Sequence, residues 1–141
     1  MILKEFQYKI LHRYLPTNSL LYKMKKVESN RCTFCNLYVE TVKHIFYECI
    51  ESKNLWFMIQ IVLEKIDCTV TKLICKDVVL GYKLENVTVN NMFINNVILQ
   101  GKFYLWKCRA MGIKPPYIKF REYVMYRTST DKSLDRLCNY I

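Results

Sequence analysis

Glycine and proline are scarce in this chain of 141 residues, with three of each. The scarcity excludes collagen-like repeats, Gly-rich linkers and Pro-rich ligands, and it argues against an all-β chain with many tight turns. Gly101 and Gly112 are too far apart for a Gly-rich phosphate loop. A nucleotide-binding enzyme of that type is therefore excluded.

Long apolar segments and a secretion signal are also missing. The run Leu55–Ile59 ends at Gln60, and no segment is long enough to cross a bilayer. Charges interrupt the first residues where a secretion signal needs an apolar stretch. The seven cysteines therefore indicate a reducing, intracellular compartment, the nucleus or the cytoplasm, in which thiols bind metal or stay buried.

Positive charge is in excess and lies at the two ends. The 22 Lys and Arg against 12 Asp and Glu give a net charge of +10. Residues 1–31 and 102–141 carry this excess, whereas the middle of the chain is close to neutral. Two basic arms favour a polyanion as partner, either nucleic acid or an acidic surface. The alternative is that the charge only keeps the protein soluble.

Apolar residues recur with helical spacing along most of the chain. The pattern predicts helices over 3–14, 19–26, 53–66 and 91–110, a fifth helix that opens at Pro115 and Pro116, and a last helical segment that reaches 141. Residues 67–90 have no clear period and could form either a short helix with a turn or a strand. Phe6, Ile10 and Tyr14 are expected in the core, and Met24 is expected to face inward. The fold class is mostly α, a small helical domain.

Four residues have the spacing of a metal site, Cys32-x2-Cys35-x8-His44-x4-Cys49. Thiolate and imidazole are the ligands that zinc prefers, and a Cys3His set completes a tetrahedron. Four protein ligands leave no open position, so the predicted Zn2+ is structural and not catalytic. Asn36 tolerates the left-handed backbone that such a turn needs. Cys49 should lie where the preceding short helix unwinds.

The alternative for this cluster is a set of ordinary buried thiols with a surface histidine. Cys68, Cys75, Cys108 and Cys138 are interpreted as small buried apolar residues. With only two histidines in the chain, a Ser-His-acid triad is not supported. The domain organisation is then a helical zinc-binding module, 1–66, and a helical basic tail, 67–141, packed on it as one structural unit.

Residues 3–56 resemble the zinc-binding domain downstream of the reverse transcriptase in non-LTR (LINE-type) retrotransposons. The order and spacing of several pieces carry the resemblance. The pieces are Phe6-x3-Ile10-Leu11-His12-x2-Leu15-Pro16-Thr17-Asn18, Leu21-Tyr22, Cys32-x2-Cys35, Glu40-Thr41-Val42-x-His44-Ile45-Phe46-x-Glu48-Cys49 and Leu55-Trp56. Asn36 and Ile50 stand where the family often has Gly and Pro, and neither departure removes a ligand.

The resemblance implies the C-terminal segment, or a shortened or host-adopted copy, of a retrotransposon protein. The chain has neither the paired aspartates of a polymerase nor an endonuclease, so we expect no enzyme activity. In the family this region is thought to hold the element's RNA near the polymerase. The implied partners are RNA or another single-stranded nucleic acid, and the polymerase part of the same element.

Cationic and aromatic residues are the candidates for nucleic-acid contacts, because cations pair with phosphates and rings stack on bases. They are Lys23, Lys25, Lys26, Arg31, Lys102, Trp106, Arg109, Lys119, Tyr123 and Tyr126. Trp106 and the tyrosines could equally be core or cation–π residues. The predicted function is a non-catalytic nucleic-acid-binding zinc module. The alternative is a protein-interaction module that docks onto the polymerase or another acidic partner. A metal-dependent hydrolase is a weaker third reading, since it would need an open zinc position.

Overall fold

The computed structural model describes residues 3–66, 68–82, 89–120 and 122. Tyr123 and Tyr126 therefore lie outside the described residues, as does the expected last helical segment. Within the described residues the fold is mostly helical and contains no strand, apart from one isolated bridge between Arg31 and Val39. The predicted mostly-α class is confirmed. The elements are α1 Leu3–Leu11, α2 Asn18–Lys23, η1 His44–Glu48, α3 Ile50–Ile66, α4 Cys75–Leu80, α5 Val89–Ala110 and η2 Tyr117–Lys119.

α1 is an amphipathic helix that ends one turn earlier than predicted. Phe6 and Ile10 are buried as expected. Arg13 has a φ of 58° and reverses the chain. The Arg13 amide donates to the Ile10 carbonyl and the Tyr14 amide to the Lys9 carbonyl, which is the Schellman pattern. Tyr14 therefore leaves the helix and is 65% exposed, so its predicted place in the core is wrong.

α2 ends in the same way. Lys25 has a φ of 57°, and the amides of Lys25 and Lys26 donate to the carbonyls of Tyr22 and Leu21. The helix stops at Lys23 and not at residue 26, and Met24 is 55% exposed, which corrects its predicted inward position. Both helices thus carry a basic residue at the left-handed position where glycine is usual.

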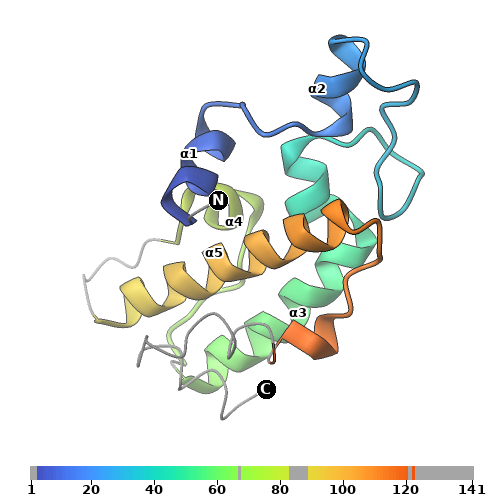
Figure 1. The fold of residues 1–141 in the computed structure, drawn as a ribbon. Helices are drawn as coiled ribbons and strands as arrows, with labels where there is room; N and C mark the ends of the chain where they lie inside the picture. Colours follow the sequence, from blue (N-terminus) through green and yellow to red (C-terminus); the bar gives the residue numbers. More distant parts are fainter. Residues whose placement is uncertain (1–2, 67, 83–88, 121, 123–141) are drawn as a thin grey trace.

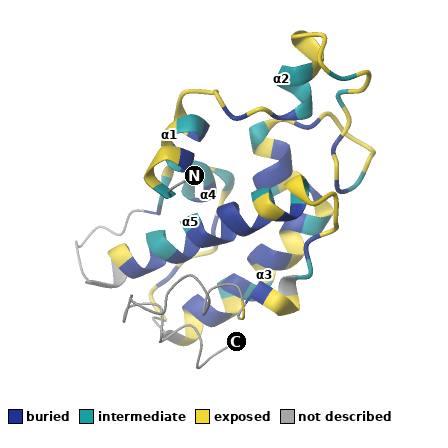
Figure 2. Ribbon diagram, viewed as in Figure 1, coloured by how far each residue is buried: buried dark blue, intermediate teal, exposed yellow. Residues whose placement is uncertain are grey.

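α3 and α5 form the centre of the molecule and cross each other (Figure 1). Gly101 of α5 lies against α3, because a Cβ built there would be 2.9 Å from the Trp56 ring and 3.1 Å from the Ile59 side chain. Glycine at this position therefore lets the side chains of α3 approach the α5 backbone closely. Figure 2 shows that the middle of α5 is buried along its length.

The core is continuous between the zinc-bearing segment and α5. The ring of Phe6 lies 6.0 Å from that of Phe46 and 5.1 Å from that of Phe103, both edge-on. Elements from 1–66 and from the following part of the chain therefore share one core.

α4 lies in the stretch that had no clear sequence pattern, and it contacts η1, α1 and α5. In the part of the chain that the structure describes, no helix has the length and apolarity of a membrane span.

One helix end follows its sequence signal, whereas two helix starts differ from the prediction. α5 ends before Gly112, which has a φ of 67° and donates its amide to the Arg109 carbonyl. After Pro116 the chain forms the short 3-10 turn η2, with Phe120 buried beyond it. α3 begins at Ile50, before the predicted start at residue 53, so Ser52 lies inside the helix.

Candidate metal centre

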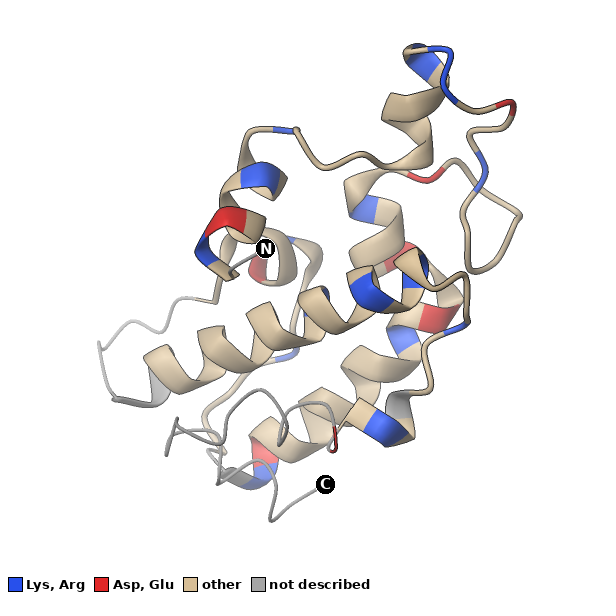
Figure 3. Ribbon diagram, in the orientation of Figure 1, with Lys and Arg blue, Asp and Glu red and all other residues tan. Residues whose placement is uncertain are grey.

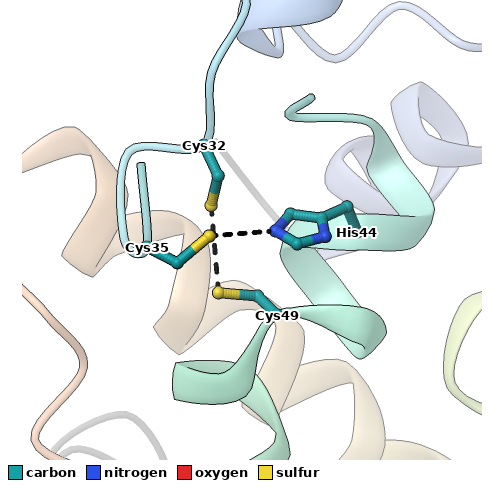
Figure 4. Close-up of side chains that lie close together, drawn as sticks. All are labelled: Cys32, Cys35, His44 and Cys49. Atoms are coloured by element: carbon teal, nitrogen blue, oxygen red, sulfur yellow. Dashed lines mark hydrogen bonds between the residues drawn. The ribbon is translucent and has the colours of Figure 1, made fainter. Parts of the chain in front are cut away.

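The four predicted ligands converge on one point between the loop after α2 and the turn η1 (Figure 4). Their ligand atoms all lie within 4.8 Å of one another. Cys32 Sγ is 3.9 Å from Cys49 Sγ, and Cys35 Sγ is 3.4 Å from His44 Nε2. Cys32, His44 and Cys49 are buried, and Cys35 is half-buried. The spacing inferred from sequence thus corresponds to one cluster in space.

The donor set and its distances fit Zn2+. A tetrahedral zinc with bonds of about 2.3 Å to sulfur and about 2.0–2.1 Å to nitrogen places two ligand sulfurs about 3.8 Å apart, and a sulfur and a nitrogen about 3.5 Å apart. The two pairs here have nearly these separations. Three thiols and one imidazole are soft to borderline ligands, which suits zinc and not calcium or magnesium. Four protein ligands make the centre a structural one.

The first pair of ligands sits on a tight turn of backbone. The Asn36 amide donates to the Cys32 carbonyl, and the Cys32 amide donates to the Tyr38 carbonyl. Asn36 has a φ of 56°, which confirms the left-handed conformation inferred for it. The Phe34 amide donates to Cys32 Sγ at 3.4 Å, and the side chain of Phe34 is buried. The turn thus holds both sulfurs on one side.

The second pair comes from η1, which is a single π-helical turn. The Cys49 amide donates to the His44 carbonyl five residues back, and Cys49 itself is extended, so the chain unwinds at this ligand as expected. Two carbonyls in this turn accept from side chains of α3. Ser52 Oγ donates to the Ile45 carbonyl, and Trp56 Nε1 donates to the Phe46 carbonyl. α3 thereby holds the turn that carries His44 and Cys49.

The two buried thiols share a hydrogen bond that sets their protonation. The bond accepted from Cys32 lowers the pKa of Cys49 below that of a free thiol. The same bond and burial raise the pKa of Cys32. Zinc, when bound, would supply the positive charge that keeps all three thiols ionised.

Glu40 connects this centre to the start of α2 and to the end of α5. It is fully buried, and its carboxylate accepts from the Asn18 amide at 2.9 Å and from the Thr33 amide at 2.7 Å. Arg109 Nε donates to it at 2.7 Å, and the same guanidinium donates to Asn18 Oδ1 at 3.0 Å. One carboxylate thus joins the first turn of α2, the Cys32 turn and the end of α5. The sequence analysis assigned no role to Glu40, although it belongs to one of the motif pieces quoted there.

Three of the candidate nucleic-acid contacts surround a hollow at the end of α2. Lys23, Lys25 and Lys26 are exposed, and with Tyr22 they line a cavity of about 570 Å³. Figure 3 shows the basic residues at this tip of the molecule. Arg31 is also exposed, and its guanidinium donates to the Leu37 carbonyl at 3.1 Å. Their role in nucleic-acid binding stays a prediction.

The predicted binding face on α5 needs correction. Lys102 is 2% exposed, and its Nζ donates to Gln7 Oε1 and to the Val79 carbonyl. Burial lowers its pKa to about 7. Arg109 is held by Glu40 and Asn18, and its guanidinium lies 4.6 Å from the centre of the half-buried Trp106 ring. These three residues have structural partners because α5 packs this side against α1, α4 and the zinc segment. Lys119 is exposed.

Residues 3–56 match the protein family described as zinc-binding in reverse transcriptase. The match spans all four metal ligands together with Asn18, Glu40, Ser52 and Trp56. No curated protein and no solved structure matches the chain at a significant level.

Proposed function

We propose that this protein is a non-catalytic zinc module that binds RNA or another single-stranded nucleic acid as part of a reverse transcriptase system. The observation that carries the proposal is the cationic tip formed by Lys23, Lys25 and Lys26. All three side chains are exposed around one hollow, and none of them forms a salt bridge within the described residues. Such a group of unpaired cations attracts phosphates.

The metal centre supports the proposal by fixing the base of this tip. Asn18 begins α2, and it is bound to Glu40 and to the Arg31 carbonyl, next to the first zinc ligand. The zinc turn and α2 are therefore tied together at one point. A rigid base keeps the lysines in a constant position, which reduces the entropy that ordering them on a ligand would cost.

The four-ligand donor set supports a structural role for zinc and no enzyme activity, because a catalytic zinc keeps one position for water or substrate. Three thiolate ligands also fit a reducing compartment, the nucleus or the cytoplasm. The family match supports the polymerase part of the same element as a neighbour of this module.

A salt-dependent binding assay on the full chain tests the proposal. The wild type should bind a short single-stranded RNA, and the logarithm of its affinity should fall linearly with the logarithm of salt, by about 0.7 per phosphate neutralised. A triple Lys23→Glu, Lys25→Glu, Lys26→Glu variant should bind at least tenfold more weakly (about 1.4 kcal/mol) and with a smaller salt slope.

The matched control is the triple variant Lys65→Glu, Lys72→Glu, Lys76→Glu, which makes the same charge change at exposed positions on α3, α4 and the chain before α4. Equal losses in both triple variants would show that net charge alone attracts RNA and that the tip is no site. Unchanged affinity in the tip variant would also contradict the proposal.

A protein-docking module is the second candidate, and one observation favours it. Leu37, Tyr38 and Ile50 are each more than half exposed and line a cavity of about 640 Å³ beside Cys35 and His44. Exposed apolar residues gathered around a hollow are typical of a protein interface. If the wild type binds no RNA at low salt but binds the polymerase part, and Leu37→Ser weakens that binding, the docking function replaces the first.

A further inference from the structure

Three aromatic rings form an exposed cluster at the end of α1, away from the cationic tip at the end of α2. The ring centres of Tyr8 and His12 lie 4.1 Å apart, and those of His12 and Tyr14 lie 6.2 Å apart with only 24° between their planes. Tyr8 and Tyr14 are 6.5 Å apart. Tyr8 is 53% exposed, Tyr14 is 65% exposed and His12 is exposed. The rings contact one another yet keep much of their surface in water.

The backbone builds this cluster at a conformational cost. Arg13 takes the left-handed conformation that a non-glycine residue avoids, and this reversal returns Tyr14 to the side of Tyr8. Without it, a continuing helix would place Tyr14 on the core face with Phe6 and Ile10, as the helical spacing predicts. The Tyr14 ring thus lies outside the core, beside the exposed rings of Tyr8 and His12.

The charge around the cluster decides which ligand suits it. Aromatic clusters bind either cations or planar rings. Residues 1–31 carry a strong excess of Lys and Arg, and Arg13 lies within the cluster's own sequence, so a cationic ligand such as a methylated lysine would be repelled. A base of a single-stranded nucleic acid supplies a planar face together with a phosphate for the cations.

We propose that Tyr8, His12 and Tyr14 form a stacking platform for a base of single-stranded nucleic acid. This inference rests on the proposed nucleic-acid binding and adds a second contact to it. The platform would stack on the face of a base, whereas the cationic tip would pair with the phosphates. The loop that joins α1 to α2 leads from the platform to the start of α2, and the far end of α2 carries the cationic tip. Figure 3 shows a basic residue in this loop.

The test separates base contacts from phosphate contacts. A short oligoadenylate is compared with an abasic strand of the same length and charge, both titrated against the full zinc-loaded chain. The double variant Tyr8→Ala, Tyr14→Ala should bind the oligoadenylate about 5- to 150-fold more weakly, which is the range for losing one stacked base. Its affinity for the abasic strand should equal that of the wild type.

Two further variants act as controls. Tyr8→Phe, Tyr14→Phe keeps both rings and should bind the oligoadenylate as the wild type does. Phe57→Ala removes a ring that is 71% exposed on α3, outside the cluster, and should change neither affinity. Zinc content and far-UV circular dichroism should match the wild type in every variant, because the removed rings are exposed.

Each other outcome overturns one proposal and identifies which. Equal losses on both strands, or no loss at all, would contradict the stacking platform while nucleic-acid binding stands. A wild type that binds both strands equally well would contradict it too. A wild type that binds neither strand at low salt would overturn the proposed function itself, and with it the platform.

Discussion

Glu40 is a buried carboxylate in a protein of net positive charge, and its partners explain why it is tolerated. A charge removed from water is costly unless it is paired and hydrogen-bonded. Glu40 accepts from two backbone amides, from the Thr33 hydroxyl at 2.6 Å and from Arg109, which is itself only 14% exposed. The charge is therefore fully satisfied. Removing either Glu40 or Arg109 would leave the other one buried without its ion-pair partner.

We expect Glu40→Gln to destabilise the folded protein by about 3–5 kcal/mol, the range for breaking a buried pair from one side. The amide keeps the shape but loses the charge that Arg109 needs, and it has only one oxygen to accept with. Urea unfolding of the zinc-loaded protein measures the change. Glu5→Gln, which removes the exposed pair with Lys9, should leave the midpoint in place. A midpoint shift for Glu40→Gln as small as that control would contradict the assignment.

Residue spacing was enough to predict the four zinc ligands, because all four lie within one short segment and the donor types select the metal. The Glu40–Arg109 pair could not be predicted, since its members are 69 residues apart and each is an ordinary charged residue in sequence. Arg109 was instead assigned to a binding face. Only the packing of α5 against the zinc segment gives it a structural partner.

At the scale of elements, the long helices were predicted well and their ends less well. α3 and α5 follow their periodicity closely. α1 and α2 end early because Arg13 and Lys25 take the role usually held by glycine, and nothing in the residue type signals it. Lys102 was misplaced because Gly101 to Leu105 are all buried. A helix buried on nearly all sides has no polar face from which to choose a surface.

Lys102 joins three helices, since its ammonium on α5 is bonded to Gln7 of α1 and to the Val79 carbonyl of α4. Desolvation lowers its pKa to about 7, below the usual value near 10.5. The unfolded chain therefore binds more protons than the folded one between about pH 7 and 10. By linkage this lysine makes the folded state more stable as the pH rises through that window, and least stable below pH 7.

We expect the unfolding free energy of the wild type to carry a Lys102 contribution that rises by up to about 1.4 kcal/mol per pH unit above pH 7. Lys102→Met removes this contribution, so the difference between the two proteins should change with pH while any dependence from zinc thiolates cancels. Urea unfolding at several pH values between 7 and 9 measures it. A difference that stays constant over this range would show that the ammonium is not desolvated.

At the scale of the whole molecule, the zinc segment and the core are one body. Phe46 lies in the same π-helical turn as His44, and its ring packs against Phe6 and lies 6.1 Å from that of Trp106. Loss of the metal would therefore affect the packing of α1 and α5 as well as the loop. The division into 1–66 and 67–141 stays a prediction, but the shared core argues that neither part is stable alone.

We expect one zinc per chain and a folded state that depends on it. Structural zinc contributes about 10–16 kcal/mol in small modules, which is comparable to the whole stability of about 5–15 kcal/mol of a domain. Chelation, or Cys35→Ser, should therefore unfold the segment from α2 to η1 and lower the thermal midpoint of the remainder. Elemental analysis with circular dichroism measures both effects. Cys68 is exposed, so its predicted burial is wrong, and it lies outside the cluster. Cys68→Ser is therefore the matched control and should keep its zinc and its midpoint. A Cys35→Ser protein that folds without metal at the wild-type midpoint would show that the four side chains are only neighbours in the core.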